Sequence, residues 1–227
     1  MRPRFLFSFA LVAFFASTLI VSAAPKWTVL FDGKNADQWR GYHRDGFPDD
    51  CWVIENGTLR TLPGKPGPVD LITKEEYGDF ELELEWKVTP GANSGVIYHA
   101  SEEFDHSWRT GAEYQVLDDE KAGDGKDPKK SAASLYALIA PNKDKHLKPV
   151  GEWNKTRIVF KNNHVEHWLN GKKVVEYQWG SPELKELIAN SKFSSMPKFG
   201  TLSKGVIALQ HHGGDVSFRK IRIRKLD

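Results

Sequence analysis

Residues 80–88 read Phe-Glu-Leu-Glu-Leu-Glu-Trp-Lys-Val, an unbroken alternation of apolar and charged side chains. Side chains of a β-strand point alternately to its two faces, so this stretch predicts a strand with one face in the core and the other in water. The face expected in the core carries Phe80, Leu82, Leu84, Trp86 and Val88. The charged side chains from Glu81 to Lys87 are expected to face solvent.

Shorter strand signals lie on both sides of this stretch and are separated by turn residues. The expected strands cover residues 27–31, 51–54, 58–61, 71–72, 94–99, 112–117, 154–161, 165–169, 172–177, 205–210 and 216–224. Asn56-Gly57 signals a hairpin, while Asn162-Asn163 and Asn170-Gly171 signal the two turns of a meander. So many short strands in one chain predict a β-sandwich.

Helix signals are few. Thr73 and Glu76 form a capping-box pattern that predicts one short turn before Gly78. Ser181 followed by Pro182 predicts the start of a second, longer helix. The fold class predicted from the residues is therefore all-β, a jelly-roll β-sandwich with one or two short helices.

The N-terminus has the order of a secretory signal peptide. Arg2 and Arg4 form a basic start, residues 5–21 are apolar, and Ser22-Ala23-Ala24 supplies the small residues of a cleavage site. A membrane anchor is the alternative, but the apolar run is short of the ~20 residues that a spanning helix needs. We expect residues 1–23 to be removed, leaving residues 24–227 as one domain of a periplasmic or secreted protein without a stable membrane anchor.

Charge and cysteine content exclude several classes of function. The chain has 32 Lys and Arg against 30 Asp and Glu, and loss of Arg2 and Arg4 would leave 30 of each. A neutral chain is not expected to bind nucleic acid. Cys51 is the single cysteine, so neither an internal disulfide nor a cysteine-based metal site is expected.

Polar residues interrupt the strand signals at five places, which are residues 91–99, 111–118, 151–154, 167–171 and 209–213. Asn, Asp, Gln and Glu are poor strand formers, and their burial costs free energy unless partners are present. Five such interruptions predict one polar cleft on a β-scaffold, as a site for a sugar would need. We expect this cleft to contain Asn93, Arg109, Glu113, Gln115, Trp153, Asn154, Gln210 and His211.

Glu113 is the first candidate for a catalytic base. It shares a strand face with Gln115, because the two are separated by one residue. An alternative remains open, in which Glu113 is a buried structural carboxylate paired with Arg109 or another cation. Glu85 lies at the end of its strand that is nearer to Asn93, so it could also reach the cleft.

His211 and Asp118 complete the catalytic candidates. His211 follows an apolar strand and precedes Gly213-Gly214, so a loop could present it as a proton donor. The neighbouring His212 is expected to point elsewhere. Asp118 could be a second acid, a metal ligand or, as we favour, a turn residue. Glu113, Asp118 and His211 could bind a divalent metal by residue type, although their spacing does not require one. We expect no organic cofactor.

Together these motifs resemble the 3-keto-disaccharide hydrolase domain family. The matching segments are residues 30–34, 73–80, 91–95, 113–118, 151–154, 167–171, 209–213 and 218–221. The resemblance implies a concanavalin-like sandwich, an exported protein, and cleavage of glycosides or disaccharides whose C3 hydroxyl has been oxidised to a ketone. Such cleavage would begin with abstraction of the C2 proton, by hydrolysis or by elimination followed by hydration. The alternative is a carbohydrate-binding module of the same fold without catalysis, which would need no base.

Overall fold

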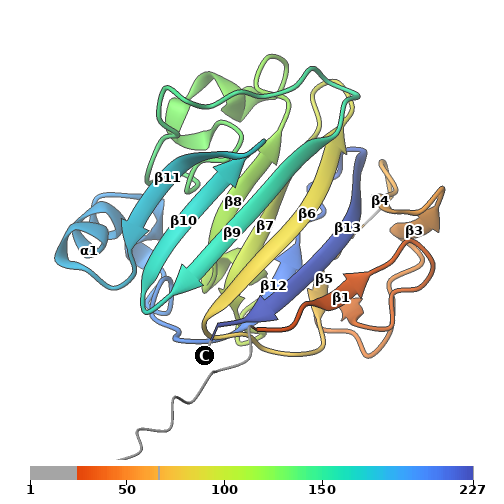
Figure 1. Ribbon diagram of the computed structural model, residues 1–227, viewed down its shortest axis with the longest axis horizontal. Coiled ribbons are helices and arrows are strands. Elements are labelled where there is room, and N and C mark those ends of the chain that lie inside the picture. The colour runs from red at the N-terminus through yellow and green to blue at the C-terminus, as the bar shows by residue number, and fades with distance from the viewer. Residues whose placement is uncertain (1–24, 66, 227) are drawn as a thin grey trace, which may run out of the picture.

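The computed structural model describes residues 25–65 and 67–226, and the expected signal peptide lies outside these residues. Two antiparallel sheets pack face to face as a sandwich, and Figure 1 looks onto the larger one. The larger sheet has the order β11-β10-β9-β6-β13-β4-β3, with β1 paired to β13. Its strands are β1 (Thr28–Phe31), β3 (Trp52–Glu55), β4 (Thr58–Thr61), β6 (Phe80–Val88), β9 (Asn154–Lys161), β10 (His164–Leu169), β11 (Lys172–Gln178) and β13 (Val216–Lys225).

The smaller sheet lies behind, in the order β2-β5-β12-β7-β8. Its strands are β2 (Trp39–Gly41), β5 (Leu71–Thr73), β7 (Asn93–Ala100), β8 (Ala112–Leu117) and β12 (Val206–Leu209). The expected all-β sandwich is therefore confirmed, including the hairpin at Asn56-Gly57 and the meander of β9, β10 and β11. The strand β2 carries no clear signal in the sequence.

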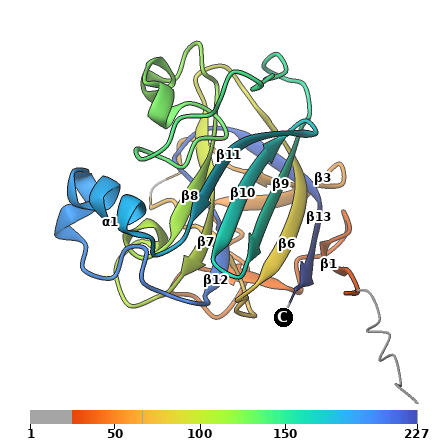
Figure 2. The ribbon, with the colours of Figure 1, turned by 60° about the vertical axis from the view of Figure 1, so that its left-hand side comes forward.

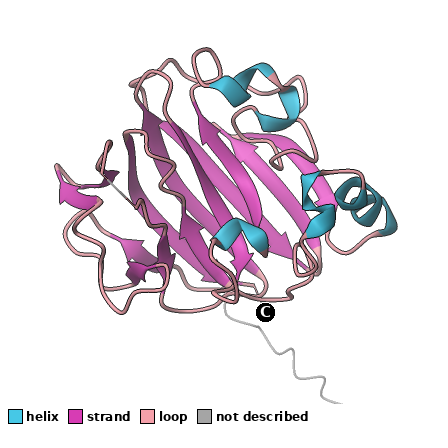
Figure 3. Ribbon diagram, turned by 180° about the vertical axis from the view of Figure 1, so that it is seen from behind, coloured by secondary structure: helices cyan, strands magenta, loops and turns pink. Residues whose placement is uncertain are grey.

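Helices are short and lie outside the sheets (Figures 2 and 3). They are α1 (Pro182–Ala189) and the 3₁₀ turns η1 (Ser107–Arg109), η2 (Gly123–Lys126), η3 (Pro128–Lys130) and η4 (Lys192–Ser195). Ser181 caps α1 as expected, because its hydroxyl accepts a hydrogen bond from Leu184 N at 3.1 Å. None of the helices in the described part of the chain has the length and apolar character needed to cross a bilayer.

The prediction of a helical turn at Thr73 is wrong. Thr73 is the last residue of β5, and the chain after it bends without forming a helix. The Thr73 hydroxyl donates to Glu75 O at 2.8 Å and accepts from Ile207 N at 3.0 Å. The side chain thus joins β5 to β12, because a threonine hydroxyl can satisfy strand backbone as well as a helix terminus.

The strand β6 has the two faces that its alternation predicts. Phe80, Leu82, Leu84, Trp86 and Val88 are buried in the core between the sheets. Its other face carries ion pairs, which join Glu81 to Arg224, Glu83 to Arg222 and Glu85 to Arg219. The outer face of the larger sheet is therefore a ladder of paired charges.

The smaller sheet also has two different faces. Val96, Tyr98, Tyr114 and Val116 point into the main core, where Tyr98 Oη lies 2.8 Å from His167 Nε2. Asn93, Gly95 and Ile97 of β7 and Glu113 and Gln115 of β8 face the other way, onto the side seen in Figure 3, around which the short helices lie. This outer face carries the polar residues that the strand pattern predicts. His99 breaks the alternation, with a φ of 52°, and its ring packs against Phe160 in the core.

Candidate functional site

A pocket of about 140 Å³ opens on the outer face of the smaller sheet. It is lined by Asn93, Trp108, Glu113, Gln115, Tyr136, Lys192, Gln210 and His212. Asn93, Glu113 and Gln115 come from β7 and β8, and Gln210 follows β12. The four remaining residues come from loops and 3₁₀ turns, so the floor is built from strands and the rim from connections.

Strand pairing places the floor residues side by side. Gln115 lies opposite Gly95, and Glu113 lies opposite Ile97. Gly95 has no side chain, so the space above it is available to the Glu113 carboxyl. Gln210 is fixed beside them because its backbone N–H donates to Gly95 O at 2.9 Å. The floor is therefore part of the hydrogen-bonded sheet and has little freedom to move.

The Glu113 carboxyl is the strongly perturbed acid of this pocket. The residue is only 7% exposed, and its side chain makes no hydrogen bond or ion pair within the described chain. Burial raises its pKa to about 8; the nearby Lys192 opposes this shift, while Asp70 and Asp124 add to it. A carboxyl group with a pKa close to neutral can both accept and release a proton at physiological pH.

Two amide groups on the floor have buried atoms without partners. Gln115 Oε1 accepts from Val116 N at 3.2 Å, and this leaves Gln115 Nε2 unpaired. Asn93 Oδ1 is also buried and unpaired. Buried polar atoms are usually hydrogen-bonded, so one free donor and one free acceptor beside Glu113 indicate a place for a polar ligand.

The rim of the pocket is aromatic and cationic. Lys192 Nζ lies 4.2 Å from the ring centroid of Tyr136 and 5.6 Å from that of Trp108. Tyr136 is held in place because its hydroxyl donates to Asp124 Oδ2 at 3.0 Å. Aromatic rings can cover the apolar face of a sugar, while a cation can face developing negative charge.

Asp70 connects the two segments that bring Trp108 and His212 to the rim. Its carboxylate accepts from Ser107 Oγ at 2.5 Å and from the backbone N–H of His211 at 3.0 Å. Ser107 precedes Trp108, and His211 precedes His212. Burial raises the pKa of Asp70, although both hydrogen bonds and the nearby His106 and His212 oppose this shift.

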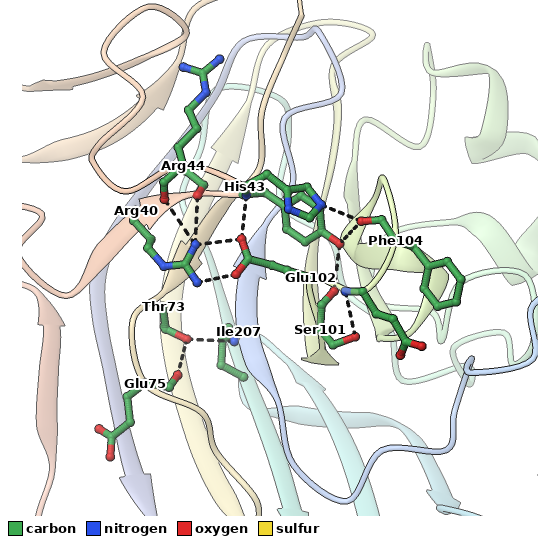
Figure 4. A network of polar contacts seen from close by, with 12 residues as sticks. Arg40, His43, Arg44, Thr73, Glu75, Ser101, Glu102, Phe104 and Ile207 are labelled. Atoms are coloured by element: carbon green, nitrogen blue, oxygen red, sulfur yellow. Dashed lines mark hydrogen bonds and ion pairs between the residues drawn. The ribbon is translucent and has the colours of Figure 1, made fainter.

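A second network, drawn in Figure 4, anchors the start of the loop between β7 and β8. The same loop carries Trp108. Arg40 of β2 pairs with Glu102 of this loop through both of its terminal nitrogens. Glu102 also accepts from His43 N at 2.6 Å, and Tyr42 Oη donates to the backbone oxygens of Ser101 and Phe104. These contacts hold the start of the loop against the edge of the smaller sheet.

Four of the residues predicted from sequence thus meet in one pocket, namely Asn93, Glu113, Gln115 and Gln210. His211 does not line this pocket. Its ring packs edge-on against Trp52, with the ring centroids 5.8 Å apart, and burial lowers its pKa. His212, expected to point away, lines the pocket instead. The strand β12 ends at Leu209, so strand alternation no longer sets the side-chain directions at these two histidines.

Two candidates on the same side of the molecule have structural partners. Asp118 accepts from Gly91 N at 2.8 Å and from Glu120 N at 3.0 Å, as a turn residue does. Burial alone would raise its pKa, but these backbone donors hold it below the usual value. Arg109 Nε lies 2.6 Å from Asp105 Oδ1, so Arg109 does not pair with Glu113.

The remaining candidates belong to the larger sheet and lie apart from the pocket. Glu85 pairs with Arg219 at 2.7 Å and Lys220 at 3.0 Å on its outer face. Arg219 lies over the ring of Trp153, 3.9 Å from its centroid. Asn154 is buried, and its Oδ1 accepts from Lys148 N and from Asn170 Nδ2. These side chains support the larger sheet and its turns.

Sequence reasoning missed the residues that connections bring to the pocket. Trp108, Tyr136 and Lys192 lie on three different connections, and Asp70 precedes β5. A Trp within a polar loop is the single signal that could have marked one of them. The others become visible only when the loops are placed in space.

Larger hollows lie over the outer face of the larger sheet and contain paired charges. One hollow over this sheet, of about 620 Å³, is lined in part by Glu83, Glu85, Arg219 and Arg222, and among these Glu83 pairs with Arg222 and Glu85 with Arg219. Another, of about 410 Å³, lies between connections and is lined in part by Asp118. Among the described residues, His164, Glu166 and Glu176 have potential ligand atoms within 4.8 Å of one another. Lys173 bridges both of these carboxylates, so an ammonium group already supplies the positive charge there.

Comparison with known proteins identifies relatives along almost the whole chain. Residues 26–224 match the sequence profile of the 3-keto-alpha-glucoside-1,2-lyase-like domain. A 3-keto-disaccharide hydrolase of Bacteroides thetaiotaomicron is 36% identical, over 90% of this chain and 80% of that protein.

Solved structures agree with this assignment. A proposed glycosyl hydrolase of Parabacteroides distasonis superposes with a TM-score of 0.81 at 30% identity, covering 88% of this chain and 94% of that one. SCLam, an endo-β-1,3(4)-glucanase of family GH16, has a TM-score of 0.53 at 9% identity, covering 90% and 94% of the two chains. At that identity the second likeness concerns the fold alone.

Proposed function

Because the chain belongs to the family of 3-keto-alpha-glucoside-1,2-lyase-like domains and is a glycoside-cleaving hydrolase, we propose that its substrates are 3-keto-glycosides or 3-keto-disaccharides. The observation that carries this proposal is the Glu113 carboxyl, buried on the pocket floor with a raised pKa. Beside it lie an unpaired amide donor and an unpaired amide acceptor. This combination is what removal of a proton from a polar, carbon-acid substrate requires.

The chemistry begins at C2 of the sugar. A ketone at C3 makes the C2 proton acidic, and Glu113 in its ionised form removes that proton. The electron pair of the C2–H bond moves toward the C3 oxygen, and its return expels the oxygen substituent at C1. The resulting double bond between C1 and C2 then takes up water, so the overall reaction is hydrolysis.

Each neighbouring group supports one part of this reaction. Gln115 Nε2 donates to the C3 oxygen, where negative charge develops, and Asn93 Oδ1 accepts from a sugar hydroxyl. His212, at the exposed rim, donates a proton to the leaving oxygen. Trp108 and Tyr136 cover an apolar face of the ring.

The same proposal includes the site of action. The basic, apolar and small residues in succession over residues 1–24 support export with removal of residues 1–23. The reaction would then take place in the periplasm or outside the cell. Mass analysis of the exported protein should give a start at or near Ala24, and a mature exported chain that retains Met1 would contradict this part.

The reaction is tested by offering purified protein the 3-keto and the unoxidised form of one disaccharide. Cleavage of the 3-keto form alone is expected. Deuterium placed at C2 should exchange with solvent or slow the reaction, because the C2 proton must leave first. Parallel reactions with a chelator decide whether a divalent ion takes part. Equal cleavage of the unoxidised sugar would instead indicate ordinary glycosidase chemistry. Binding of both forms without cleavage would indicate a carbohydrate-binding module.

A further inference from the structure

Lys192 lies at the exposed rim of the pocket, above a buried carboxyl and among aromatic rings. Its backbone is fixed because the next residue, Phe193, is buried and stacks on Phe199 with ring centroids 3.8 Å apart. Ser191 Oγ also accepts from Phe193 N at 3.1 Å. A fixed backbone thus directs a flexible amine over the pocket whose floor carries Glu113.

The amine has aromatic neighbours in place of a close counter-ion. Lys192 Nζ lies over three rings, with centroids at 4.2 Å for Tyr136, 5.1 Å for Phe193 and 5.6 Å for Trp108. Within the described chain it makes no hydrogen bond or salt bridge. Lys145, by contrast, pairs with Asp119 at 2.5 Å and with Ser131 Oγ at 2.8 Å. An amine left unpaired among rings is available to react.

We propose that Lys192 Nζ forms an iminium bond with C3 of the 3-keto substrate, which makes Lys192 a covalent catalyst of the elimination. This inference rests on the proposed function, because the iminium requires a ketone. Its geometric basis is that one pocket contains an unpaired amine, a buried carboxyl and an unpaired amide donor. These are respectively the nucleophile, the base and the group that polarises the carbonyl.

The steps balance without any added reagent. The uncharged amine adds to C3, and its proton passes to the carbonyl oxygen, which becomes a hydroxyl held by Gln115 Nε2. This hydroxyl takes a proton from solvent and leaves as water to give the iminium, and that proton is returned when the iminium is hydrolysed. Glu113 then removes the C2 proton, the electrons pass to the iminium nitrogen, and their return expels the C1 oxygen, which takes a proton from His212. One water adds at C1, and a second hydrolyses the iminium and regenerates the amine. The reaction is redox-neutral and consumes one water overall.

Partial loss of hydration increases the uncharged, reactive fraction of this amine. Lys192 is exposed at the rim, and partial burial of its amine against the rings lowers its pKa; Glu113 and Asp124 oppose this shift, while Lys130 adds to it. A lower pKa increases the uncharged fraction that can attack a carbonyl. The iminium also withdraws electrons more strongly than a ketone, which makes the C2 proton easier to remove.

Reductive trapping tests the covalent bond. The Glu113→Gln variant is incubated with a 3-keto methyl glucoside and cyanoborohydride, because without the base the intact iminium should accumulate. The expected product gains the mass of the substrate less one oxygen, and peptide mapping places the gain on Lys192. A Glu113→Gln, Lys192→Arg double variant should show no such gain. The inference would be overturned if wild type cleaved this substrate but neither wild type nor Glu113→Gln gave an adduct on Lys192.

The kinetics of the Lys192→Arg variant distinguish covalent catalysis by Lys192 from a role of its positive charge alone. Arginine keeps the positive charge but does not form the iminium, so turnover should be lost, while Lys198→Arg on the same connection should keep the wild-type rate. Wild-type turnover by Lys192→Arg would show that only the charge is needed and would refute the covalent step. If wild type itself fails to cleave any 3-keto glycoside, the proposed function fails first, and the iminium fails with it.

Discussion

The backbone of Gly95 lies directly beneath the carboxyl of Glu113, and the two share one small space on the outer face of the sheet. A Cβ atom at residue 95 would come within 2.3 Å of Glu113 Oε1 and within 2.8 Å of its Cδ. Real Cβ atoms do not approach so closely. The glycine therefore sets the position of the carboxyl, although it contributes no functional group.

Gly95→Ala is expected to displace Glu113 and lower kcat strongly, while the fold survives. The atoms that must move belong to a side chain, which can rotate away at little cost to the sheet. A displacement of about 1 Å at a catalytic group can cost ~10²-fold in rate. Gly46→Ala is the matched control, because an added Cβ there meets nothing within 4 Å. Unchanged kcat in Gly95→Ala would show that the position of Glu113 is not critical.

Glu113→Gln should reduce kcat by ~10²–10⁴-fold and leave sugar binding largely intact. The amide keeps the shape of the carboxyl but does not accept the C2 proton. In wild type, kcat/KM should rise with pH through about 8, since the base acts in its ionised form. The pH profile and calorimetric binding of a 3-keto glucoside measure both effects. If kcat/KM instead falls as pH rises through about 8, Glu113 acts as a proton donor.

The same carboxyl should make stability depend on pH. Its pKa is raised to about 8 from an ordinary value of 4.5, so between these values the folded state holds a proton that the unfolded state releases. Wild-type stability should therefore fall as pH rises through this range, by up to about 1.4 kcal/mol for each unit of pKa difference. The stability of the Glu113→Gln variant should not show this fall with rising pH. Equal slopes of Tm against pH for both proteins would contradict the raised pKa.

The two adjacent histidines should behave differently. His212→Asn should slow cleavage of glycosides with poor leaving groups more than those with good ones, because it removes the proposed proton donor at the rim. His211→Ala should instead lower stability by about 1–3 kcal/mol, because its buried ring packs against Trp52. Kinetics with a series of aryl 3-keto glucosides and thermal unfolding measure the two effects. If His211→Ala gave the leaving-group-dependent loss of rate and His212→Asn gave only the loss of stability, His211 would be the proton donor.

The ion pair of Arg40 and Glu102 should control the rim through the loop that carries Trp108. Glu102→Gln removes the charge that Arg40 and the His43 backbone N–H hold. We expect a raised KM with a smaller change in kcat, and faster amide hydrogen exchange over residues 101–111. Glu103→Gln serves as a control, because Glu103 is exposed on the same loop. Unchanged exchange in Glu102→Gln would show that other contacts suffice to anchor the loop.

Local periodicity explains which part of the structure was predictable. The alternation of residues 80–88 and the spacing of Glu113 and Gln115 depend only on the geometry of a strand, so both faces were assigned correctly. Periodicity does not tell which sheet a strand joins. Trp153 and Glu85 were therefore grouped with Glu113, although Glu85 belongs to the larger sheet and Trp153 lies beside that sheet, against Arg219.

The rim was beyond local reasoning for a different reason. Trp108 reaches the pocket because Ser107 is tied to Asp70, a residue 37 positions away in the sequence. Tyr136 is directed by its bond to Asp124 in another 3₁₀ turn. Such contacts are set by tertiary packing, and a single sequence carries no periodic signal for them.

The division of the pocket into a floor of paired strands and a rim of connections has a consequence for how such enzymes diverge. Substitutions or insertions near Trp108 and Tyr136 change the opening without breaking a ladder hydrogen bond of β7 or β8. Connections tolerate such changes far better than central strands do. Descendants of one ancestor could therefore acquire different ligand preferences while inheriting the same pocket floor.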